Sequence, residues 1–519
     1  MRTWAHAASA RYAMGRLRGL TRRGRAPRVA IIGAGFGGIA AAVALRQAGM
    51  DDVVIFEAGD GVGGTWRRNI YPGAACDVPS HLYSFSFALN RRWSRTYAQQ
   101  PEILAYLEQV TDDFDLRRHL LLGTRVTEVR WDEAAAHWEL QVHRDGQPAE
   151  TERADLVVSA VGLFGEARLP AIEGLSDFGG WVMHTSAWDR GTDVTGQRVA
   201  VVGTGASAVQ VVPELARMAK SVSVFQRTPP WMVPKDDRPF SAEELAGFRR
   251  APWAPYRERW KVWKQFHDFT ATAASDPLVA ERSKVATDFL DTTVADPALR
   301  EALTPHYPFR CKRVLLGDGF YRALQRDNVD LTTESIERVA RDGVLTADGR
   351  LVEVDTIVCA TGFQTSSYLA GIEVIGRGGQ SLHRRWGADP TAYLGTAASG
   401  FPNFFMLYGP NTNQAGNSII YVLEAASRLV ASAASLLARR GGSLDVSPEA
   451  ERRFNDELSA DLERSVWTQC DSYFRSPSGR IVTQWPYSEL DYARRTWRLN
   501  RRDWIHRTGE VPITASRSS

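Results

Sequence analysis

Two short glycine-rich segments, each between an apolar run and a helical pattern, constrain the fold more than any other feature of the chain. The first is Gly33-Ala34-Gly35-Phe36-Gly37-Gly38, which follows the continuous apolar run of residues 29–32. A helical run over 39–48 and a second apolar run over 53–56 come next, and the latter ends at Glu57. This order of strand, G-x-G-x-x-G turn, helix, strand and acid, with the acid about twenty residues past the turn, predicts a dinucleotide-binding βαβ unit.

The second glycine-rich segment differs from the first at the position that reads the ribose. Gly203-Thr204-Gly205-Ala206-Ser207-Ala208 follows the apolar run 199–202 and precedes a predicted helix to about 220 and a strand over 222–225. No acid ends this strand, and Gln226-Arg227-Thr228 stands there instead. An acid accepts a free ribose 2′-hydroxyl, whereas an arginine accommodates a 2′-phosphate. The first unit therefore suits FAD, and the second suits NADPH.

The two units predict an α/β protein with two Rossmann-like dinucleotide-binding domains. We expect an FAD domain over 29–165 that resumes over 389–519, where the chain has a helical C-terminal region, and an NADPH domain over 166–388. A helical insertion over about 236–310 interrupts the α/β alternation of the NADPH domain. Residues 1–28 form a basic extension. The 519 residues are enough for domains with full cores.

Composition excludes several classes of protein. Apolar residues make up 44% and charged residues 24% of the chain, and no stretch approaches the ~18 uninterrupted apolar residues of a membrane span. The cysteines are scattered without a C-x-x-C pair, which argues against a disulfide framework, a zinc site and a dithiol redox centre. We therefore expect no metal centre and a reducing, cytoplasmic location. The four are Cys76, Cys311, Cys359 and Cys470.

Charge is concentrated in the N-terminal extension. Residues 1–28 hold eight arginines and no acid, so a net charge of +3 leaves −5 for the rest of the chain. A mildly acidic body gives no reason to expect nucleic acid as a partner. The extension is most simply a loose tail; the alternative is a basic arm that touches anionic lipid.

Two segments outside the glycine loops allow a structural and a functional interpretation. Aromatic side chains at 253, 256, 260 and 263 recur at three- and four-residue steps, which predicts one stripe of a helix. Core packing is the usual meaning of such a stripe, and a ligand wall or a membrane face is the alternative. The segment 307–313 carries Arg310, Lys312 and Arg313. It is either a solvated basic loop or a hinge-side loop with Lys312 on the nucleotide phosphate and Arg313 at the flavin.

Two further motifs complete a pattern that resembles the Baeyer–Villiger monooxygenases along nearly all of residues 29–510. One is Gly63-Gly64-Thr65-Trp66 with Tyr71-Pro72-Gly73 and Asp77. The other is F-x-G-x-x-x-H-x-x-x-W-D over 178–189, which we expect to be a linker between the domains. The resemblance implies FAD contacts by Gly33, Gly35, Gly38, Glu57, Gly64, Thr65, Trp66, Asp77, Tyr83 and the backbone of Val126. It implies NADPH contacts by Gly203, Thr204, Gly205, Ala206, Ser207, Arg227, Thr228 and Lys312.

The same resemblance implies the reaction and its catalytic residues. NADPH reduces FAD, O2 adds to give a C4a-peroxyflavin, and the peroxide converts a ketone to an ester or lactone. Arg313 would stabilise the negative charge, since arginine does not lose its proton, and Asp77 would hold Arg313. We expect His184 to make a domain-orienting hydrogen bond rather than to transfer protons.

Three other functions are alternatives to this one. An N- or S-oxygenating flavin monooxygenase is the main rival, but its fingerprint tends to carry Phe or Tyr where this chain has Trp188. A non-catalytic FAD-binding or lipid-associated protein would not need the set of Arg227, Lys312 and Arg313. The missing cysteine pair excludes a disulfide reductase.

Overall fold

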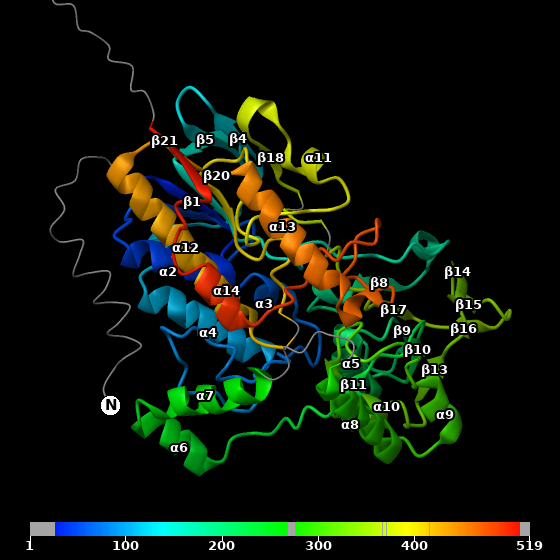
Figure 1. Cartoon of the computed structure of the whole chain (residues 1–519). Coiled ribbons are helices and arrows are strands. Elements are labelled where there is room, and N and C mark those ends of the chain that lie inside the picture. The colour runs from blue at the N-terminus through cyan, green and yellow to red at the C-terminus, as the bar shows by residue number, and fades with distance from the viewer. Residues whose placement is uncertain (1–25, 268–275, 366, 370, 415, 509–519) are drawn as a thin grey trace, which may run out of the picture.

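The first of two parallel five-stranded sheets contains the first glycine loop (Figure 1). The computed structural model describes residues 26–267, 276–365, 367–369, 371–414 and 416–508. The strands of this sheet pair in register, with Val29 opposite Val53 on one side and Leu156 on the other. Apolar runs that are buried on both faces are typical of parallel sheets. In sheet order the strands are β19 (Phe404–Met406), β7 (Leu156–Ser159), β1 (Val29–Ile32), β2 (Val53–Phe56) and β3 (Leu120–Leu121).

Helices cover one face of this sheet and a smaller sheet covers the other. Helices α2 (Phe36–Gln47) and α12 (Ile419–Arg440) pack along each other on the first face. By length and composition, α12 alone among the described helices could cross a membrane, but 67% of its apolar window is buried in the fold. The smaller sheet packs Trp131 and Trp138 against the opposite face. Its order is β18 (Glu373–Ile375), β4 (Thr124–Asp132), β5 (His137–Arg144) and β6 (Glu150–Ala154).

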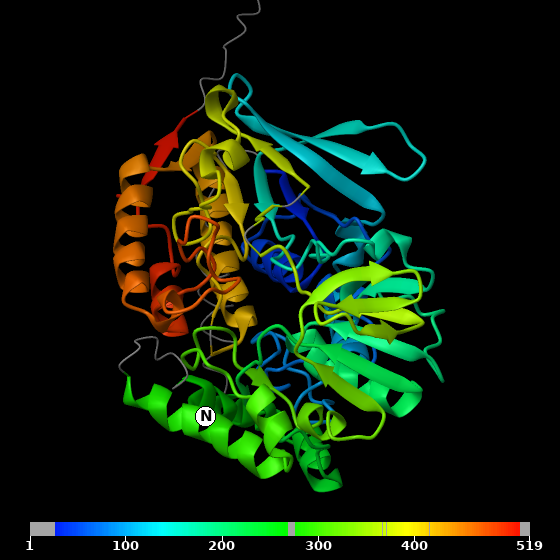
Figure 2. The ribbon, with the colours of Figure 1, turned by 90° about the vertical axis from the view of Figure 1, so that its right-hand side faces the viewer.

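The second five-stranded sheet contains the second glycine loop and lies beside the first unit (Figure 2). Helix α5 (Ala206–Met218) follows the loop. A small antiparallel sheet of β14 (Ile336–Ala340), β15 (Gly343–Thr346) and β16 (Leu351–Glu353) is attached to it. Two Rossmann-like units are thus confirmed. The sheet order is β13 (Val329–Thr332), β10 (Ser221–Phe225), β9 (Arg198–Val202), β17 (Thr356–Cys359) and β8 (Trp181–His184).

The segment 178–189 is not the linker that we expected. Residues 181–184 form β8, the edge strand of the second sheet, with His184 opposite Cys359 of β17. Gly179 and Gly180 suggested a turn, but the fold needs glycine there because neighbouring backbone carbonyls pack closely against both residues. A Cβ on Gly180 would lie 2.2 Å from the carbonyl oxygen of Asp355, and one on Gly179 would lie 2.9 Å from that of Arg341.

The chain returns to the first unit earlier than residue 389, which is the boundary that the sequence predicted. Strand β18 pairs in parallel with β4, with Val374 opposite Val129. Helix α11 (Leu382–Trp386) follows β18, and the side chains of Leu382 and Trp386 belong to the same core cluster as Trp138. Residues 373–386 therefore pack with the FAD-side sheets.

The helical insertion is divided between the two units. Helices α6 (Ala242–Arg250) and α7 (Ala254–His267) pack on the first unit, since Phe248 and Ala254 belong to its core. Helices α8 (Pro277–Thr293) and α9 (Pro297–Ala302) pack on the second unit, whose core includes Leu290. In Figure 1, α6 and α7 lie below α4 (Gln100–Asp113) and apart from α8 and α9.

The prediction that the aromatic stripe of α7 is core is wrong. Trp253 is 59% exposed, Trp260 is 58% exposed and Tyr256 is 38% exposed. The three- and four-residue period gives a common face but not its direction. The face of α7 that turns inward carries Ala254 and Val262, which are 7% and 8% exposed.

The C-terminal region packs back on the first unit. Its elements are β20 (Ser443–Val446), α13 (Pro448–Glu463), α14 (Glu489–Arg495) and β21 (Trp504–Arg507). Trp467, Trp485 and Trp504 belong to the core cluster that contains α2 and α12, whereas Trp497 is 67% exposed.

Candidate active site

The first glycine loop leaves open space at its centre and is tightly packed at both ends. Gly33 has φ of 102°, and a Cβ there would lie 2.7 Å from the carbonyl oxygen of Ala160. A Cβ on Gly38 would lie 1.9 Å from the carbonyl oxygen of Gly33. At Gly35, by contrast, the nearest atom to a Cβ would be the Cα of Gly64, at 3.7 Å. The backbones of Gly35 and Gly64 thus face each other and leave a cradle at the N-terminus of α2, where a pyrophosphate would meet backbone N–H groups.

Glu57 ends β2 beside this cradle. Its carboxylate accepts hydrogen bonds from the backbone N–H of Ala34, at 2.8 Å, and of Gly59, at 2.7 Å. Its backbone carbonyl accepts the N–H of Thr124, at 2.8 Å, at the start of β4. Val126 lies two residues further along β4 and is buried. The structure therefore brings the predicted ribose acid and Val126 to the same end of the sheet as Gly33.

The Gly63–Asp77 block begins with the short helix α3 (Thr65–Arg68), of which Gly64 is the N-terminal cap. The indole N–H of Trp66 donates to the hydroxyl of Tyr83 at 3.1 Å. Tyr83 in turn packs edge-on against Phe36, the first residue of α2, with 5.1 Å between the ring centroids. Three predicted FAD contacts, Thr65, Trp66 and Tyr83, therefore lie around the first turn of α2.

Buried polar atoms without partners mark the same region. The hydroxyl oxygen of Ser418, at the N-terminus of α12, and the amide nitrogen of Gln414 have no hydrogen-bond partner in the described part of the chain. A Cβ on Gly37 would lie 3.6 Å from the side chain of Leu423, so the first turns of α2 and α12 adjoin. Buried polar groups are normally paired, and a polar ligand between these turns would pair them. The residues present fit a bound flavin nucleotide.

The second glycine loop repeats the geometry of the first. Gly203 has φ of 103°, and a Cβ there would lie 2.9 Å from the carbonyl oxygen of Ala360, as Gly33 packs on Ala160. The nearest atom to a Cβ on Gly205 would be 4.0 Å away. Thr204 donates through its hydroxyl to the carbonyl of Thr228 at 3.2 Å. Ala206 and Ser207 open α5, so the five predicted residues of this loop adjoin one helix N-terminus, and Thr228 is bonded to the same loop.

Arg227 and Lys312 form a pair of neighbouring cations. Burial and the charge of Arg227 lower the pKa of Lys312, and Asp471 opposes them. Arg227 makes no ion pair among the residues that the structure describes, and Lys312 lies over the ring of Tyr307 at 4.9 Å. Two adjacent cations of this kind suit a phosphate, so the pair fits the 2′-phosphate of NADPH.

Arg313 and Asp77 form an ion pair between the two units. The Asp77 side chain is 24% exposed and that of Arg313 is 38% exposed. The charge of Asp77 raises the pKa of Arg313. Burial would raise the pKa of Asp77, but the charge and the hydrogen bond of Arg313 outweigh burial and lower it. Both groups therefore stay charged, and the pair holds a fixed cation at the junction of the FAD-side block and the 307–313 loop.

Two tyrosines near Arg313 were not predicted. Tyr473 hydrogen-bonds to the Arg313 side chain, and Tyr408 lies near enough for the charge of Arg313 to act on it. Tyr408 also donates to the side-chain oxygen of Asn413 at 2.7 Å. Neither tyrosine belongs to a motif, and both come from the C-terminal return of the chain. Only the three-dimensional structure brings them to the site.

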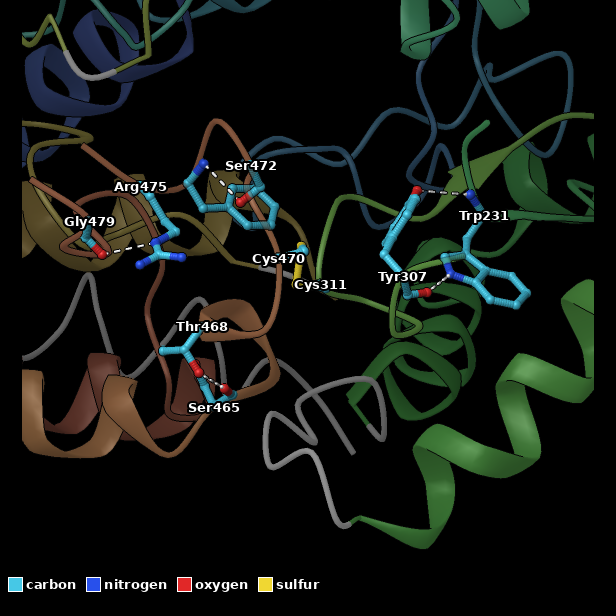
Figure 3. Close-up of a disulfide and its surroundings, with 10 residues drawn as sticks. Trp231, Tyr307, Cys311, Ser465, Thr468, Cys470, Ser472, Arg475 and Gly479 are labelled. Carbon is cyan, nitrogen blue, oxygen red and sulfur yellow. Dashed lines mark hydrogen bonds between the residues drawn. A yellow bond between two sulfur atoms is a disulfide. The ribbon is translucent and has the colours of Figure 1, made fainter. Parts of the chain in front are cut away.

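A disulfide joins Cys311 to Cys470, which corrects the prediction that the cysteines form no such framework (Figure 3). The two Cα atoms are 6.0 Å apart, although 159 residues separate the cysteines in sequence. Cys311 directly precedes Lys312 and Arg313, and Cys470 is three residues from Tyr473. The bond thus ties the loop with the catalytic candidate to the C-terminal segment that contacts it. Cys76 and Cys359 are free and buried.

Gln210 on α5 connects the Gly63–Asp77 block to the second unit, a role that the sequence did not indicate. Its side-chain oxygen accepts from the hydroxyl of Tyr71 at 2.7 Å, and its side-chain nitrogen donates to the carbonyl of Ala75 at 2.9 Å. A Cβ on Gly73 would lie 2.4 Å from the carbonyl oxygen of Gln210. The motif residues Tyr71 and Gly73 therefore hold the two units together close to Asp77.

The fingerprint residues of segment 178–189 make local contacts, and none of the bonds described for them involves Arg313. The His184 Nδ1 accepts the backbone N–H of Ser186 at 3.1 Å, and its ring packs edge-on against Phe363 at 5.7 Å. Burial lowers the pKa of His184, and a hydrogen bond to the backbone of Gly362 partly offsets this. Trp188 is buried and lines an open groove of about 520 Å³ against α4. The Asp189 carboxylate accepts the backbone N–H of Gly191, as in an ordinary turn.

Comparison with known proteins finds close relatives over most of the chain. A family described as "Pyridine nucleotide-disulphide oxidoreductase" matches residues 30–243. A "Baeyer-Villiger monooxygenase" of Pseudomonas aeruginosa is 41% identical over 464 residues, which cover 88% of this chain and 87% of the relative. A protein of the same name from Streptomyces coelicolor is 40% identical over 481 residues, or 91% of each.

Solved structures agree with these relatives. A closed crystal structure of cyclohexanone monooxygenase matches with a TM-score of 0.82 and 30% identity, covering 93% of this chain and 99% of the other. An oxidised steroid monooxygenase bound to NADP matches with a TM-score of 0.79 and 33% identity, covering 91% and 97%.

Proposed function

Because the chain belongs to the Baeyer–Villiger monooxygenase family, we propose that it oxidises a ketone to an ester or lactone with NADPH and O2. The observation that carries the proposal is the Arg313–Asp77 ion pair, which lies where the FAD-side block meets the Lys312–Arg227 pair. When bound, FAD reduced by NADPH would activate O2 for this reaction. A cytoplasmic site of action is part of the proposal.

The two glycine loops bind the cofactors in this scheme. The Gly33–Gly38 loop, Glu57 and the Gly64–Asp77 block bind FAD, and the unpaired groups of Gln414 and Ser418 offer it further hydrogen bonds. The Gly203–Ser207 loop binds the pyrophosphate of NADPH. Arg227, Thr228 and Lys312 bind its 2′-phosphate, which distinguishes it from NADH.

Arg313 acts on the negative charge that develops on oxygen as the ketone carbonyl is attacked. At an effective dielectric constant near 20, a charge pair at 4 Å is worth about 4 kcal/mol, enough to decide whether the anion persists. Arginine suits this role because it stays protonated, and here Asp77 raises its pKa further. Asp77 holds the guanidinium, and the Tyr473 side chain hydrogen-bonds to it as well.

The test of the reaction is NADPH consumption by the FAD-loaded enzyme against cyclic, linear and aromatic ketones and a sulfide, with products identified. We expect an ester or lactone from at least one ketone. Sulfoxide without any ester would favour the N- or S-oxygenating class, and no substrate-dependent NADPH consumption would favour a non-catalytic FAD-binding protein.

The role of Arg313 is tested separately. We expect Arg313→Ala to bind FAD and to reduce it with NADPH, yet to form no ester, because the fixed cation is lost. Arg313→Lys keeps a charge but not the planar contact with Asp77 and serves as the matched variant. Normal ester yield from Arg313→Ala would contradict the assignment.

A further inference from the structure

The outward face of α7 carries large aromatic side chains that are partly exposed. Trp253, Tyr256 and Trp260 lie at helical spacing and are 38–59% exposed. Trp260 stacks on Trp263 with 5.1 Å between the ring centroids. Clustered exposed aromatics of this size usually mark an interaction surface.

Cations surround these rings. Arg257 lies over Trp253 at 5.1 Å, and Lys264 lies over Trp260 at 5.9 Å. Besides the inward-bonded Arg259, residues 249–264 contain five basic residues and one acid, Glu258, which pairs with Lys261 at 3.5 Å. Arg91, from a different part of the chain, is close enough to Tyr256 for its charge to act on the phenol. The face is therefore strongly positive on a chain whose residues beyond 28 are net negative.

The inward side of α7 is fixed, so this face cannot turn into the core. The Arg259 guanidinium donates to the backbone carbonyls of Leu82, at 3.2 Å, and Ser84, at 2.6 Å. Val262 packs inward and is 8% exposed. The neighbouring α6 holds its Phe248 ring against His81 at 4.5 Å. The aromatic and basic side chains thus stand on a rigid support.

We propose that the outer face of α7 docks on an anionic lipid surface. Indole and phenol rings prefer the headgroup level of a bilayer, where one edge is apolar and the other is wet. Lys261, Lys264 and Arg257 would contact lipid phosphates at the same depth, and each basic side chain near an anionic surface strengthens binding roughly fivefold. A second copy of the chain would bring two positive faces together, and single-stranded nucleic acid requires a groove that follows its backbone.

Docking in this orientation would put the lipid on the side of α7 opposite to the loop that anchors it, and that loop is close in sequence to the candidate active site. The loop 81–84, which anchors Arg259, follows Asp77 by a few residues and contains Tyr83. A ketone dissolved in the membrane would have a short path to the site. The passage of a ketone from the membrane to the site depends on the proposed function. Docking on the lipid does not depend on it, because docking is measured without substrate.

The test is co-sedimentation of the FAD-loaded full chain with vesicles of phosphatidylcholine alone or in an equimolar mixture with phosphatidylglycerol. We expect binding to the anionic vesicles only, and loss of it at high salt. The double variant Trp253→Ala/Trp260→Ala keeps the net charge and should bind at least tenfold more weakly, because the buried apolar area is lost. Lys261→Gln/Lys264→Gln should bind roughly twenty-five-fold more weakly.

Trp181→Ala is the matched control, since Trp181 is 60% exposed on β8 in the other unit and should not affect vesicle binding. Unchanged FAD content and circular dichroism show that each variant is folded. Vesicle binding that survives in Trp253→Ala/Trp260→Ala would assign it to the basic residues 1–28 and overturn the proposal. Wild-type protein that ignores anionic vesicles, but dimerises or binds an oligonucleotide through these tryptophans, would overturn it as well.

Discussion

The Cys311–Cys470 disulfide provides the most quantitative test of the structure. Replacing Cys470 by Ser opens a loop of 159 residues in the unfolded chain. Loop-closure entropy for that length is about 17 cal/mol/K, or about 5 kcal/mol at 25 °C, as the upper limit of the lost stability. The unfolding entropy scales with chain length to about 1.1 kcal/mol/K for 519 residues, so the melting temperature should fall by about 5 °C.

The assay compares thermal unfolding of the wild type and Cys470→Ser with and without reductant. We expect the difference in melting temperature to appear only without reductant, because reduced wild type lacks the same bond. If the difference in melting temperature persists in reductant, it is caused by packing of the Cys470 side chain and not by the disulfide. Thiol titration of the denatured, unreduced wild type should find two thiols, Cys76 and Cys359. Four thiols would refute the bond, and the same count in a cell extract tests whether it forms in the cytoplasm.

Three further predictions concern cofactors and pH. Arg227→Ala should raise the KM for NADPH roughly 10- to 100-fold and leave that for NADH unchanged, because a charge-assisted hydrogen bond is lost; steady-state kinetics with both nucleotides measures this. Gly38→Ala should lose FAD, measured by the flavin-to-protein absorbance ratio, since its Cβ would lie 1.9 Å from the carbonyl oxygen of Gly33; Gly247→Ala, in open space on α6, should keep it. Burial raises the pKa of Asp445 to about 6, above its unfolded value, so its contribution to stability is complete below about pH 4 and is lost as the pH rises through about 6. The melting temperature of the wild type relative to Asp445→Asn should fall over that range, and a constant difference would contradict the shift.

The features that depend on local geometry could be predicted from the sequence. A positive φ at Gly33 and Gly203 and the close approach at Gly38 allow only glycine, so the spacing of these residues specifies the two βαβ units. The positions of Glu57 and Arg227 could be predicted as well, because each residue lies just after the second strand of its βαβ unit. The ion pair of Arg313 with Asp77 was expected from the resemblance to the family.

The features that depend on long-range packing could not be predicted from the sequence. Gly179 and Gly180 were interpreted as a linker because a glycine at a turn and one packed against a neighbouring carbonyl look the same in a sequence. The stripe of α7 has a period but no direction, and the inward contacts of Arg259 and Val262 leave Trp260 on the exposed side. Cys311 and Cys470 lack any spacing signal because the bond spans 159 residues.

The strands of the FAD-side sheet come from two separate stretches of the chain. This arrangement determines the order in which the two units can finish folding during synthesis on the ribosome. Strand β7 is made by residue 159, but its outer neighbour β19 is not made until residue 404. All five strands of the other sheet, from β8 to β17, are synthesised in between. Since domains fold as units during synthesis, the unit that starts second is finished first. Until β19 and α12 emerge, the nascent first sheet exposes an unpaired strand edge, and this interval is when the chain is most open to aggregation.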